Sequence, residues 1–184
     1  MKRALDLTIA LLALLVLGPL LLTTALAIAL ESGRPVLLRQ TRLGWHGRAF
    51  GMFKFRSMVH NAAAIGPYFT QDADPRITRV GRLIRRSSID ELPQLLNVLR
   101  GDMSLVGPRP DLPVQRQLYT DADWQQRCRV RPGITGLAQV EIRSEGVAGQ
   151  RLALDLQYVR EQSLALDLRI LWRTLGRLSG QGSN

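Results

Sequence analysis

Two adjacent carboxylates, Asp90 and Glu91, are the side chains whose types and spacing best suit chemistry in this sequence. Guanidinium groups flank them along the chain, at Arg82, Arg85, Arg86 and Arg109. A phosphoanhydride repels an anionic nucleophile, so cations must neutralise its phosphates before a carboxylate can attack phosphorus. Adjacent carboxylates beside several guanidinium groups are therefore what we expect where a phosphate is attacked.

The two acids would have separate tasks if they lie on a helix. Consecutive helical residues differ in direction by about 100°, so one carboxylate can face phosphorus while its neighbour holds a cation. Mg²⁺ is the natural cation, because it prefers oxygen ligands, binds phosphates and needs only one or two carboxylates. The sequence has no His or Cys spacing typical of a softer metal site.

Ser88 offers a purely structural interpretation of the same residues. Ser followed three residues later by Glu is a capping box, in which both acids would only start a helix. Spacing alone favours this box. Pro93 would disturb it, and the neighbouring arginines are not needed for capping. The sequence thus leaves two alternatives, a helix cap and an anion-binding site, and the cation cluster favours the second.

A short helix is predicted directly after the acidic pair. Its apolar stripe consists of Leu92, Leu95, Leu96 and Leu99. The helix is expected to end at Arg100-Gly101, a basic last turn followed by a glycine cap. The proline-containing residues 107–110 and 131–136 are predicted to be stiff turns, which can aim a side chain.

Two short strands, over residues 35–38 and 50–55, are predicted around the turn-rich residues 44–47. Lys54 lies in the second strand and Arg56 follows it. The simplest interpretation of these two cations is an ordinary solvated strand face.

An uncharged segment of 24 residues, Leu7–Leu30, predicts contact with a membrane, because a straight helix of about 36 Å could cross the hydrocarbon layer. Gly18 and Pro19 interrupt this segment at its centre, where proline kinks a helix. Both flanks are basic, with Lys2 and Arg3 before the segment and Arg34, Arg39 and Arg42 after it. The positive-inside rule favours the cytoplasm for both ends. We therefore expect a re-entrant hairpin, with Thr23 and Thr24 as candidate partners for the carbonyls freed near residue 15.

Two other interpretations of this segment stay open. A single-pass anchor tolerates a proline kink, and a cleaved secretory signal would explain Ala25-Leu26-Ala27 after a basic start, although the apolar run is longer than usual. Near the other end of the sequence, a helix with an apolar face is predicted from Leu168, Leu171, Leu175 and Leu178. Either an interfacial amphipathic helix or a helix packed on the core fits that pattern.

The composition is typical of one folded domain. The 184 residues carry 25 Lys and Arg against 15 Asp and Glu, a net charge of +10, which indicates an anionic partner. Only 5% of the residues are aromatic, so the stacking platforms of a nucleic-acid-binding protein are sparse and we expect no nucleic-acid partner. The single cysteine, Cys128, excludes an internal disulfide framework and is expected to serve packing.

Several motifs resemble, in order, the bacterial sugar transferases called small monotopic phosphoglycosyl transferases. The resemblance covers residues 1–176. Its motifs are the basic start, the apolar run broken by Pro19, Lys54-Phe55-Arg56-Ser57-Met58, Asp90-Glu91-Leu92-Pro93-Gln94, residues 101–110, residues 131–136 and Asp167-Leu168-Arg169-Ile170-Leu171. Gly18-Pro19 stands where the family often has Ser-Pro.

This resemblance implies transfer of a sugar 1-phosphate from a UDP-sugar to undecaprenyl phosphate, with release of UMP, at the start of glycan assembly. By motif position, Asp90 would be the nucleophile that forms an aspartyl-phosphosugar intermediate, Glu91 the Mg²⁺ ligand and Arg109 a phosphate holder. The remaining substrate-binding candidates that it implies are Lys54, Arg56, Arg85 and Arg131. Asp155, Tyr158 and Asp167 match further family positions without an assigned role.

The expected fold is α+β, a mostly helical compact catalytic domain with short strands on a re-entrant membrane helix. We expect the membrane helix over residues 1–33, the catalytic domain over 34–178 and a flexible tail over 179–184. The implied location is the cytoplasmic face of the bacterial inner membrane, with membrane lipid and downstream glycosyltransferases as further partners. Two alternatives are a Mg²⁺-dependent UDP-sugar hydrolase and a basic membrane-surface protein without catalysis. The sequence does not identify the sugar.

Overall fold

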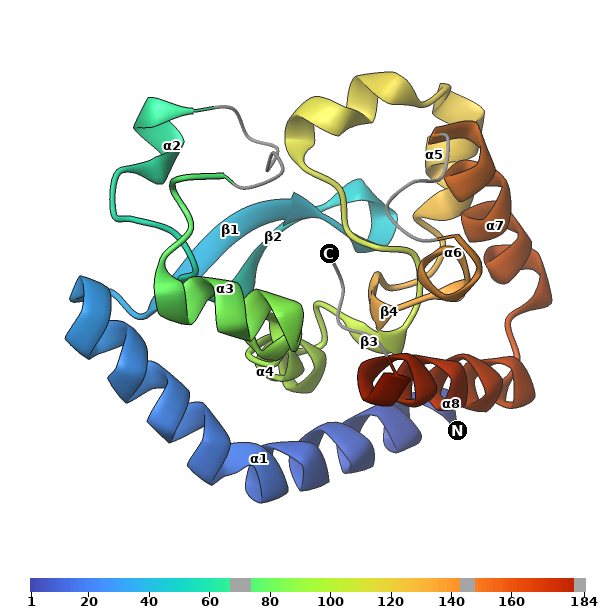
Figure 1. Cartoon of the computed structure of the whole chain (residues 1–184). Coiled ribbons are helices and arrows are strands. Elements are labelled where there is room, and N and C mark those ends of the chain that lie inside the picture. The colour runs from blue at the N-terminus through green and yellow to red at the C-terminus, as the bar shows by residue number, and fades with distance from the viewer. Residues whose placement is uncertain (67–73, 143–147, 181–184) are drawn as a thin grey trace.

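The computed structural model describes residues 1–66, 74–142 and 148–180. Helices dominate, and two small sheets of two strands each complete the fold, so the α+β prediction is confirmed (Figure 1). The elements that the text uses are α1 (Lys2–Ser32), β1 (Leu37–Leu43), β2 (Ala49–Phe55), α2 (Ala62–Ile65), α3 (Arg79–Arg86), η2 (Ile89–Glu91), α4 (Gln94–Arg100), β3 (Ser104–Val106), η3 (Pro113–Leu118), α5 (Asp121–Arg127), β4 (Gly133–Thr135), α6 (Leu137–Glu141), α7 (Ala148–Glu161) and α8 (Leu164–Gly180).

The apolar segment forms one helix, α1, which continues through Gly18 and Pro19 and is bent near its middle (Figure 1). Proline removes a backbone donor and is the expected cause of such a bend. α1 does not consist of two antiparallel arms, so the hairpin shape expected for this segment is not seen. The expected bond from Thr23 to a carbonyl near residue 15 is also absent, since the Thr23 hydroxyl donates to the carbonyl of Leu20 at 3.0 Å.

Polar contacts attach the first turns of α1 to the rest of the domain. The Lys2 ammonium lies 2.7 Å from the Asp167 carboxylate, and the buried Asp6 carboxylate accepts a bond of 2.8 Å from the Ser104 hydroxyl. Arg3 donates to the carbonyl of Val98 at 2.6 Å.

The last turn of α1 is attached as well. The Glu31 carboxylate accepts bonds from the backbone amides of Arg79 and Val80, at 2.8 and 3.0 Å, and so caps α3. Buried Arg56 donates to the carbonyls of Ser32 and Gly33, at 2.7 and 2.5 Å. Both ends of α1 are therefore bound to the same domain.

β1 and β2 form an antiparallel hairpin in which Leu38 pairs with Lys54. The predicted strands are thus confirmed, with the first one longer and later than expected. α4 packs on β2 through buried Asn97, whose side-chain amide bonds the amide of Phe53 at 2.9 Å and the carbonyl of Gly51 at 2.8 Å. This contact fixes the hairpin against the helix that follows the acidic pair.

The predicted helix after the acidic pair is confirmed as α4, which ends at Arg100 with Gly101 in the left-handed conformation, φ +92°. Residues 131–136, predicted as a turn, instead contain β4, which pairs in parallel with β3. The pairing needs glycine, because a Cβ added at Gly133 would lie 2.1 Å from the backbone nitrogen of Gly107. The main core lies between these strands and the surrounding helices, with Val98, Met103 and Ile170 almost fully buried.

Much apolar surface of the helices near the lower edge of Figure 1 is exposed. On α8, the side chains of Leu168, Trp172 and Leu175 are 53%, 76% and 62% exposed, while Ile170 is buried. On α1, the 18-residue window that is apolar enough to cross a membrane is only 11% buried. α8 reaches Gly180, and the remainder of the expected tail lies outside the described residues. Cys128 is buried, as its expected packing role requires.

Candidate active site

Asp90 and Glu91 lie in the single turn η2 between α3 and α4. Ser88, which precedes this turn, adopts the left-handed conformation with φ +55°, which is uncommon for a residue with a Cβ. Its side chain makes no capping bond to η2, and no side-chain cap is present at the start of α4 either. The capping-box interpretation is therefore wrong, and the two carboxylates are free to contact other groups.

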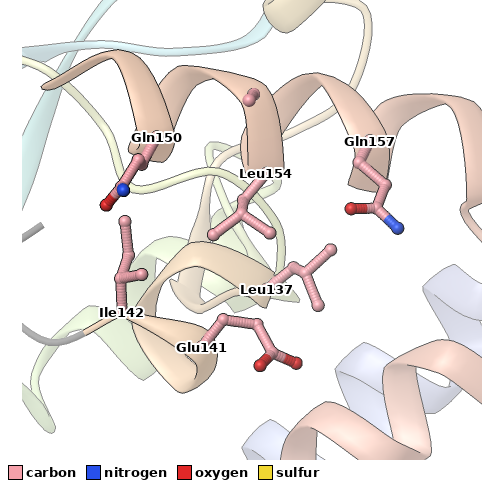
Figure 2. Close-up of a pocket in the computed structure, with 7 residues that line it drawn as sticks. Leu137, Glu141, Ile142, Gln150, Leu154 and Gln157 are labelled. Carbon is pink, nitrogen blue, oxygen red and sulfur yellow. The ribbon is translucent and has the colours of Figure 1, made fainter. Parts of the chain in front are cut away.

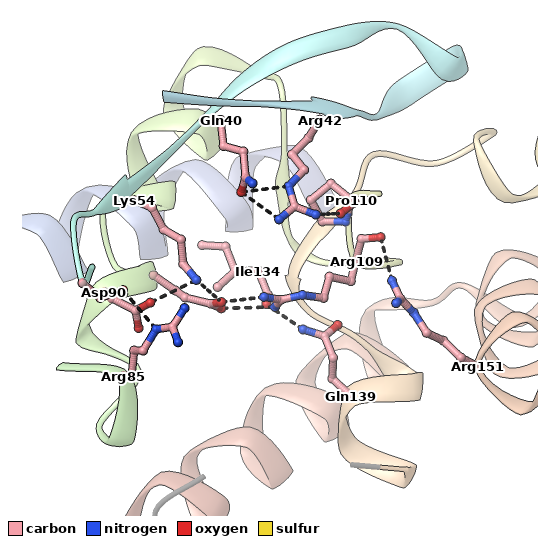
Figure 3. A network of polar contacts seen from close by, with 12 residues as sticks. Gln40, Arg42, Lys54, Arg85, Asp90, Arg109, Pro110, Ile134, Gln139 and Arg151 are labelled. Atoms are coloured by element: carbon pink, nitrogen blue, oxygen red, sulfur yellow. Dashed lines mark hydrogen bonds and ion pairs between the residues drawn. The ribbon is translucent and has the colours of Figure 1, made fainter. Parts of the chain in front are cut away.

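Lys54 of β2 bridges the two carboxylates (Figure 3). Its ammonium lies 3.0 Å from Oδ2 of Asp90 and 3.1 Å from Oε1 of Glu91. The Asn97 contact between α4 and β2 accounts for this meeting, because it holds the strand next to Lys54 against the helix that follows the acidic pair. Lys54 was expected as a substrate-binding residue, and the structure brings it to the acidic pair.

Glu91 is also clamped by Arg109. The two terminal nitrogens of the guanidinium lie 2.6 and 3.2 Å from the two oxygens of the Glu91 carboxylate. Burial alone would raise the pKa of Glu91, but Arg109 and Lys54 outweigh it and hold this pKa well below its ordinary value. Glu91 is therefore ionised throughout the neutral and mildly acidic range.

Asp90 is in a different electrostatic situation, although it is the adjacent residue. It is 3% exposed, and burial raises its pKa above the ordinary value, with the Glu91 carboxylate adding to the increase. Lys54 and Arg85 act in the opposite direction without cancelling the shift. Arg85 lies beside Asp90 in Figure 3 and donates from Nε to the Ser57 hydroxyl at 3.0 Å. A buried carboxylate whose pKa is raised and that lies beside specific cations is a candidate functional group.

Arg56 and Arg131 make their contacts away from this cluster. Arg56 is buried against the last turn of α1, as described above. Arg131 donates from Nε to the carbonyl of Gly101 at 2.8 Å and stacks over the Trp45 ring at 4.0 Å. The geometry gives these two arginines structural tasks, and their expected substrate contacts stay predictions.

Further cations, which the sequence did not single out for the site, bond the main chain at Arg109 and Pro110. They are Arg42 of β1 and Arg151 of α7, which Figure 3 shows, and Arg127 of α5. Gln40 binds Arg42, and Gln139 donates to the carbonyl of Ile134 beside Arg109. These residues are spread over more than 100 positions of the chain, so no local spacing could have indicated that they meet.

The acidic pair has the donor type that Mg²⁺ prefers, since both groups are carboxylates in a site rich in anion-binding cations. No group of three or more His, Cys, Asp or Glu side chains that could hold a metal alone is found among the described residues. Both Glu91 oxygens are occupied by cationic nitrogens. The residues fit Mg²⁺ if substrate phosphates complete its ligands and draw Lys54 away from Glu91.

A separate pocket of about 480 Å³ lies between α6 and α7 (Figure 2). It is lined by Leu137, Glu141, Ile142, Gln150, Ala153, Leu154 and Gln157. The Glu141 carboxylate is ion-paired with Arg173 of α8. None of the lining residues belongs to the cluster of Asp90, Glu91 and their cations, so this pocket is not the site of the carboxylate chemistry.

Three relatives resemble this chain along almost its whole length. An undecaprenyl-phosphate glucose phosphotransferase of Komagataeibacter xylinus is 50% identical, and the match covers 96% of this chain and 35% of the relative. A UDP-glucose:undecaprenyl-phosphate glucose-1-phosphate transferase of Caulobacter vibrioides is 47% identical, with 96% and 69% covered. A UDP-N-acetylgalactosamine-undecaprenyl-phosphate N-acetylgalactosaminephosphotransferase of Aeromonas hydrophila is 43% identical, with 95% and 42% covered.

The chain thus spans about a third of the first relative's length and about two thirds of the second's. The family model described as bacterial sugar transferase matches residues 1–181, which include α1, the acidic pair and all the cations described above. On this match, and on the geometry of the site, the chain belongs to the bacterial sugar transferase family.

Proposed function

We propose that this chain transfers a sugar 1-phosphate from a UDP-sugar to undecaprenyl phosphate, releasing UMP, as an early step of exopolysaccharide or related glycan assembly. The observation that carries the proposal is the buried carboxylate of Asp90, held beside cations in a domain that also carries a large exposed apolar helix. The printed names of the relatives support the substrate classes.

Asp90 is the proposed nucleophile. Its Oδ attacks the phosphorus that carries the sugar, the bond from that phosphorus to the UMP oxygen breaks, and UMP leaves with the bonding electrons. An aspartyl-phosphosugar remains. A phosphate oxygen of the lipid then attacks the same phosphorus and displaces the Asp90 carboxylate. Splitting the reaction in this way lets two bulky phosphates use one site in turn, and it predicts ping-pong kinetics.

The cations around the pair neutralise the diphosphate. Lys54 is the group best placed to move, because it spans both carboxylates and carries three donors that can turn from Glu91 to a phosphate. Arg109 holds Glu91 and presents positive charge where the diphosphate must lie. Mg²⁺, when bound, supplies further charge neutralisation, and Glu91 is the residue proposed to hold it. Glu91→Gln should then weaken Mg²⁺ binding, measured by calorimetry in the presence of UDP.

α1 is proposed to be re-entrant, entering and leaving one leaflet on the cytoplasmic side. A straight helix of 31 residues would put its ends about 46 Å apart, on opposite sides of a bilayer. The bend and the attachment of both ends to one domain support the re-entrant arrangement over a single-pass anchor. The contacts of Lys2 and Asp6 also make α1 part of the fold, which a cleaved signal would not be.

α8 is proposed to lie at the membrane surface. Its exposed side chains Leu168, Trp172 and Leu175 favour the interfacial interpretation over a helix packed wholly on the core. A water-soluble nucleotide sugar and a lipid phosphate can meet only at the bilayer surface, so both helices would keep the acidic pair near the headgroups. Enzymes that add further sugars to the lipid-linked product would act next.

The test uses purified protein in detergent or nanodiscs, with UDP-sugars radiolabelled in the sugar and with undecaprenyl phosphate. We expect label in the organic phase and an equimolar amount of UMP, for at least one sugar of a panel that includes glucose and N-acetylgalactosamine. UMP without lipid-linked label would indicate a hydrolase, and neither product with any sugar would support a non-catalytic membrane protein. Each of these two results would overturn the proposal.

A further inference from the structure

We propose that Arg42 and Arg127 are positioning residues, which bond the carbonyls of Pro110 and Arg109 and so fix where the Arg109 guanidinium meets Glu91. The inference deepens the proposed function and rests on it, because Arg109 is placed there beside the diphosphate. Neither residue is assigned a contact with substrate.

The loop that carries Arg109 has little support of its own. It connects β3 with η3, and it contains Pro108 and Pro110, which have no backbone N–H to donate. Its carbonyls are nevertheless held. Four consecutive carbonyl oxygens accept a bond from another element: Pro108 from the amide of Gly133 at 2.9 Å, Arg109 from Nη2 of Arg127 at 2.6 Å, Pro110 from Nη1 of Arg42 at 3.2 Å, and Asp111 from the amide of Leu43 at 2.8 Å.

Backbone amides of β4 and β1 thus hold the outer two carbonyls, and guanidinium groups hold the inner two. The inner pair consists of the carbonyl of Arg109 itself and that of the next residue, Pro110. In a regular sheet, backbone amides of a neighbouring strand would bond these carbonyls. Here two arginine side chains do so, in a loop whose prolines have no N–H to continue a sheet. This placement sets the direction of the chain at the residue that clamps Glu91.

Arg42 is itself held rigidly (Figure 3). Its Nε and Nη2 both donate to Oε1 of Gln40, at 3.2 and 2.8 Å, which leaves Nη1 directed at Pro110. Gln40 and Arg42 are two residues apart on β1 and therefore point to the same face. Burial and the nearby Arg109 lower the pKa of Arg42 to about 10, so it stays protonated at neutral pH.

Arg127 is fixed by two buried carboxylates. It is 4% exposed, and its Nη1 and Nε lie 2.6 and 2.9 Å from Asp111 and Asp155, which are almost fully buried. With Nη2 on the carbonyl of Arg109, all three nitrogens of the group are used within the protein. Arg151 adds a longer bond of 3.4 Å to the same carbonyl. A residue with every nitrogen occupied in this way supports the site instead of binding substrate.

The planar fork of arginine is needed for this task, because one end must be held while the other donates. Lysine has a single nitrogen and cannot bond Gln40 twice while also reaching Pro110. Charge is equal in the two side chains, so Arg42→Lys separates positioning from a general positive field. Arg127→Met would remove the ion pair of buried Asp155 and leave buried Asp111 ion-paired with Arg151 alone, which threatens the fold, so Arg42 is the residue to test.

The experiment compares Arg42→Met, Arg42→Lys and, as matched control, Arg48→Met, which removes an exposed arginine from the same hairpin. We expect kcat for lipid-linked sugar to fall about 100-fold in Arg42→Met and at least about tenfold in Arg42→Lys, since a displacement near 1 Å can cost this much, while KM for the UDP-sugar rises no more than about tenfold. Arg48→Met should stay within about twofold of wild type. A kcat of Arg42→Lys equal to wild type would overturn the inference.

A double-mutant cycle with Arg109→Met then asks whether Arg42 acts through Arg109. We expect Arg42→Met to weaken UDP binding about tenfold in the wild-type background and less than about twofold in the Arg109→Met background, by calorimetry on variants whose melting is cooperative. Equal weakening in both backgrounds would overturn the inference. Because the cycle reads UDP affinity, it gives a result even if wild type transfers no sugar phosphate, which would overturn the proposed function alone.

Discussion

Asp90 and Glu91 are neighbours in the chain, yet their surroundings push their pKa values in opposite directions. Arg109 and Lys54 hold the pKa of Glu91 well below its ordinary range, whereas burial raises that of Asp90. Glu91 therefore keeps its charge and is suited to hold a cation, whereas the charge of the Asp90 carboxylate is poorly solvated. Enzymes that use two carboxylates give them different roles through such differences in environment.

Asp90→Asn should abolish turnover and covalent labelling but leave the melting temperature at pH 7 equal to or above that of wild type. An acid whose pKa is raised by folding stabilises the folded state fully only below its unfolded pKa, and this stability is lost as pH rises through the folded pKa. The amide avoids the loss. Calorimetric melting and radiolabelled transfer, measured on one preparation, check both parts.

Asp111→Asn is the contrasting variant for that measurement. Asp111 is fully buried and ion-paired with Arg127 at 2.6 Å, so its neutralisation should cost about 3–5 kcal/mol of unfolding free energy. If Asp90→Asn were destabilised to the same extent, its carboxylate would be a structural anchor and not a nucleophile.

The acidic limb of kcat/KM against pH should report the ionisation of Asp90. Because the proposed reactive form is the carboxylate and burial raises its pKa, the limb is expected at higher pH than for an ordinary Asp. Lys54→Met removes a cation that lowers this pKa, so the limb should move to higher pH by roughly one unit. Arg48→Met should leave the limb in place, and a limb that is equally unmoved in Lys54→Met would refute the assignment.

At the scale of elements, sequence patterns predicted the helix and the strands whose formation depends on neighbouring residues. The leucine stripe predicted α4 and its glycine end, and two short segments on either side of a turn-rich stretch predicted the strands of the β1–β2 hairpin. The pairing of β3 with β4 was missed, because strands of three residues carry no periodicity and their pairing depends on two glycines far apart in the chain. Short parallel strands of this kind are determined by tertiary contact.

The candidate site was predictable to the same degree. Asp90, Glu91, Lys54 and Arg109 do meet, and residue type with motif position was enough to select them. Residue type alone does not tell whether an arginine lines the site or bonds the carbonyls at the end of a helix. Arg56 and Arg131 were predicted to bind substrate, but both bond carbonyls at helix ends. The network behind Arg109 joins β1, α5 and α7, which only the fold brings together.

Cysteines at exposed positions just inside and just after α1 test the path of that helix. In a Cys128→Ala background, Ala4→Cys and Arg34→Cys should both react with a membrane-impermeant maleimide only after inverted vesicles are used or cells are opened. The reason is that both ends of α1 are bound to one domain. Reaction of the two cysteines from opposite sides would establish a spanning helix.

At the scale of the whole molecule, exposed apolar side chains gather on α1 and α8, which lie together along the lower edge of Figure 1. An exposed apolar surface of this extent marks an interaction with a membrane or another apolar partner. The charge distribution agrees, since the excess of basic residues is suited to anionic headgroups and to substrates that carry phosphates.

Val16→Asp should release the protein from vesicles. Val16 is 77% exposed on α1, and an aspartate at the centre of an inserted helix costs about 2.5–3.5 kcal/mol, which is roughly a 100-fold weaker partition. Leu118→Asp is the matched control, because Leu118 is 65% exposed in η3, away from α1 and α8. Flotation with liposomes measures both, and equal flotation of the two variants would contradict insertion of α1.

The attachment of α1 at both of its ends has a further consequence for how the protein sits in lipid. A helix tethered at one end can tilt or slide to match the thickness of its bilayer. In the re-entrant arrangement proposed above, either movement would break contacts at Lys2 or Glu31, so the protein and not the lipid would set the depth of immersion. The bent helix would then hold Asp90 at the depth of the acceptor's phosphate. Turnover should therefore be insensitive to the acyl-chain length of the lipid.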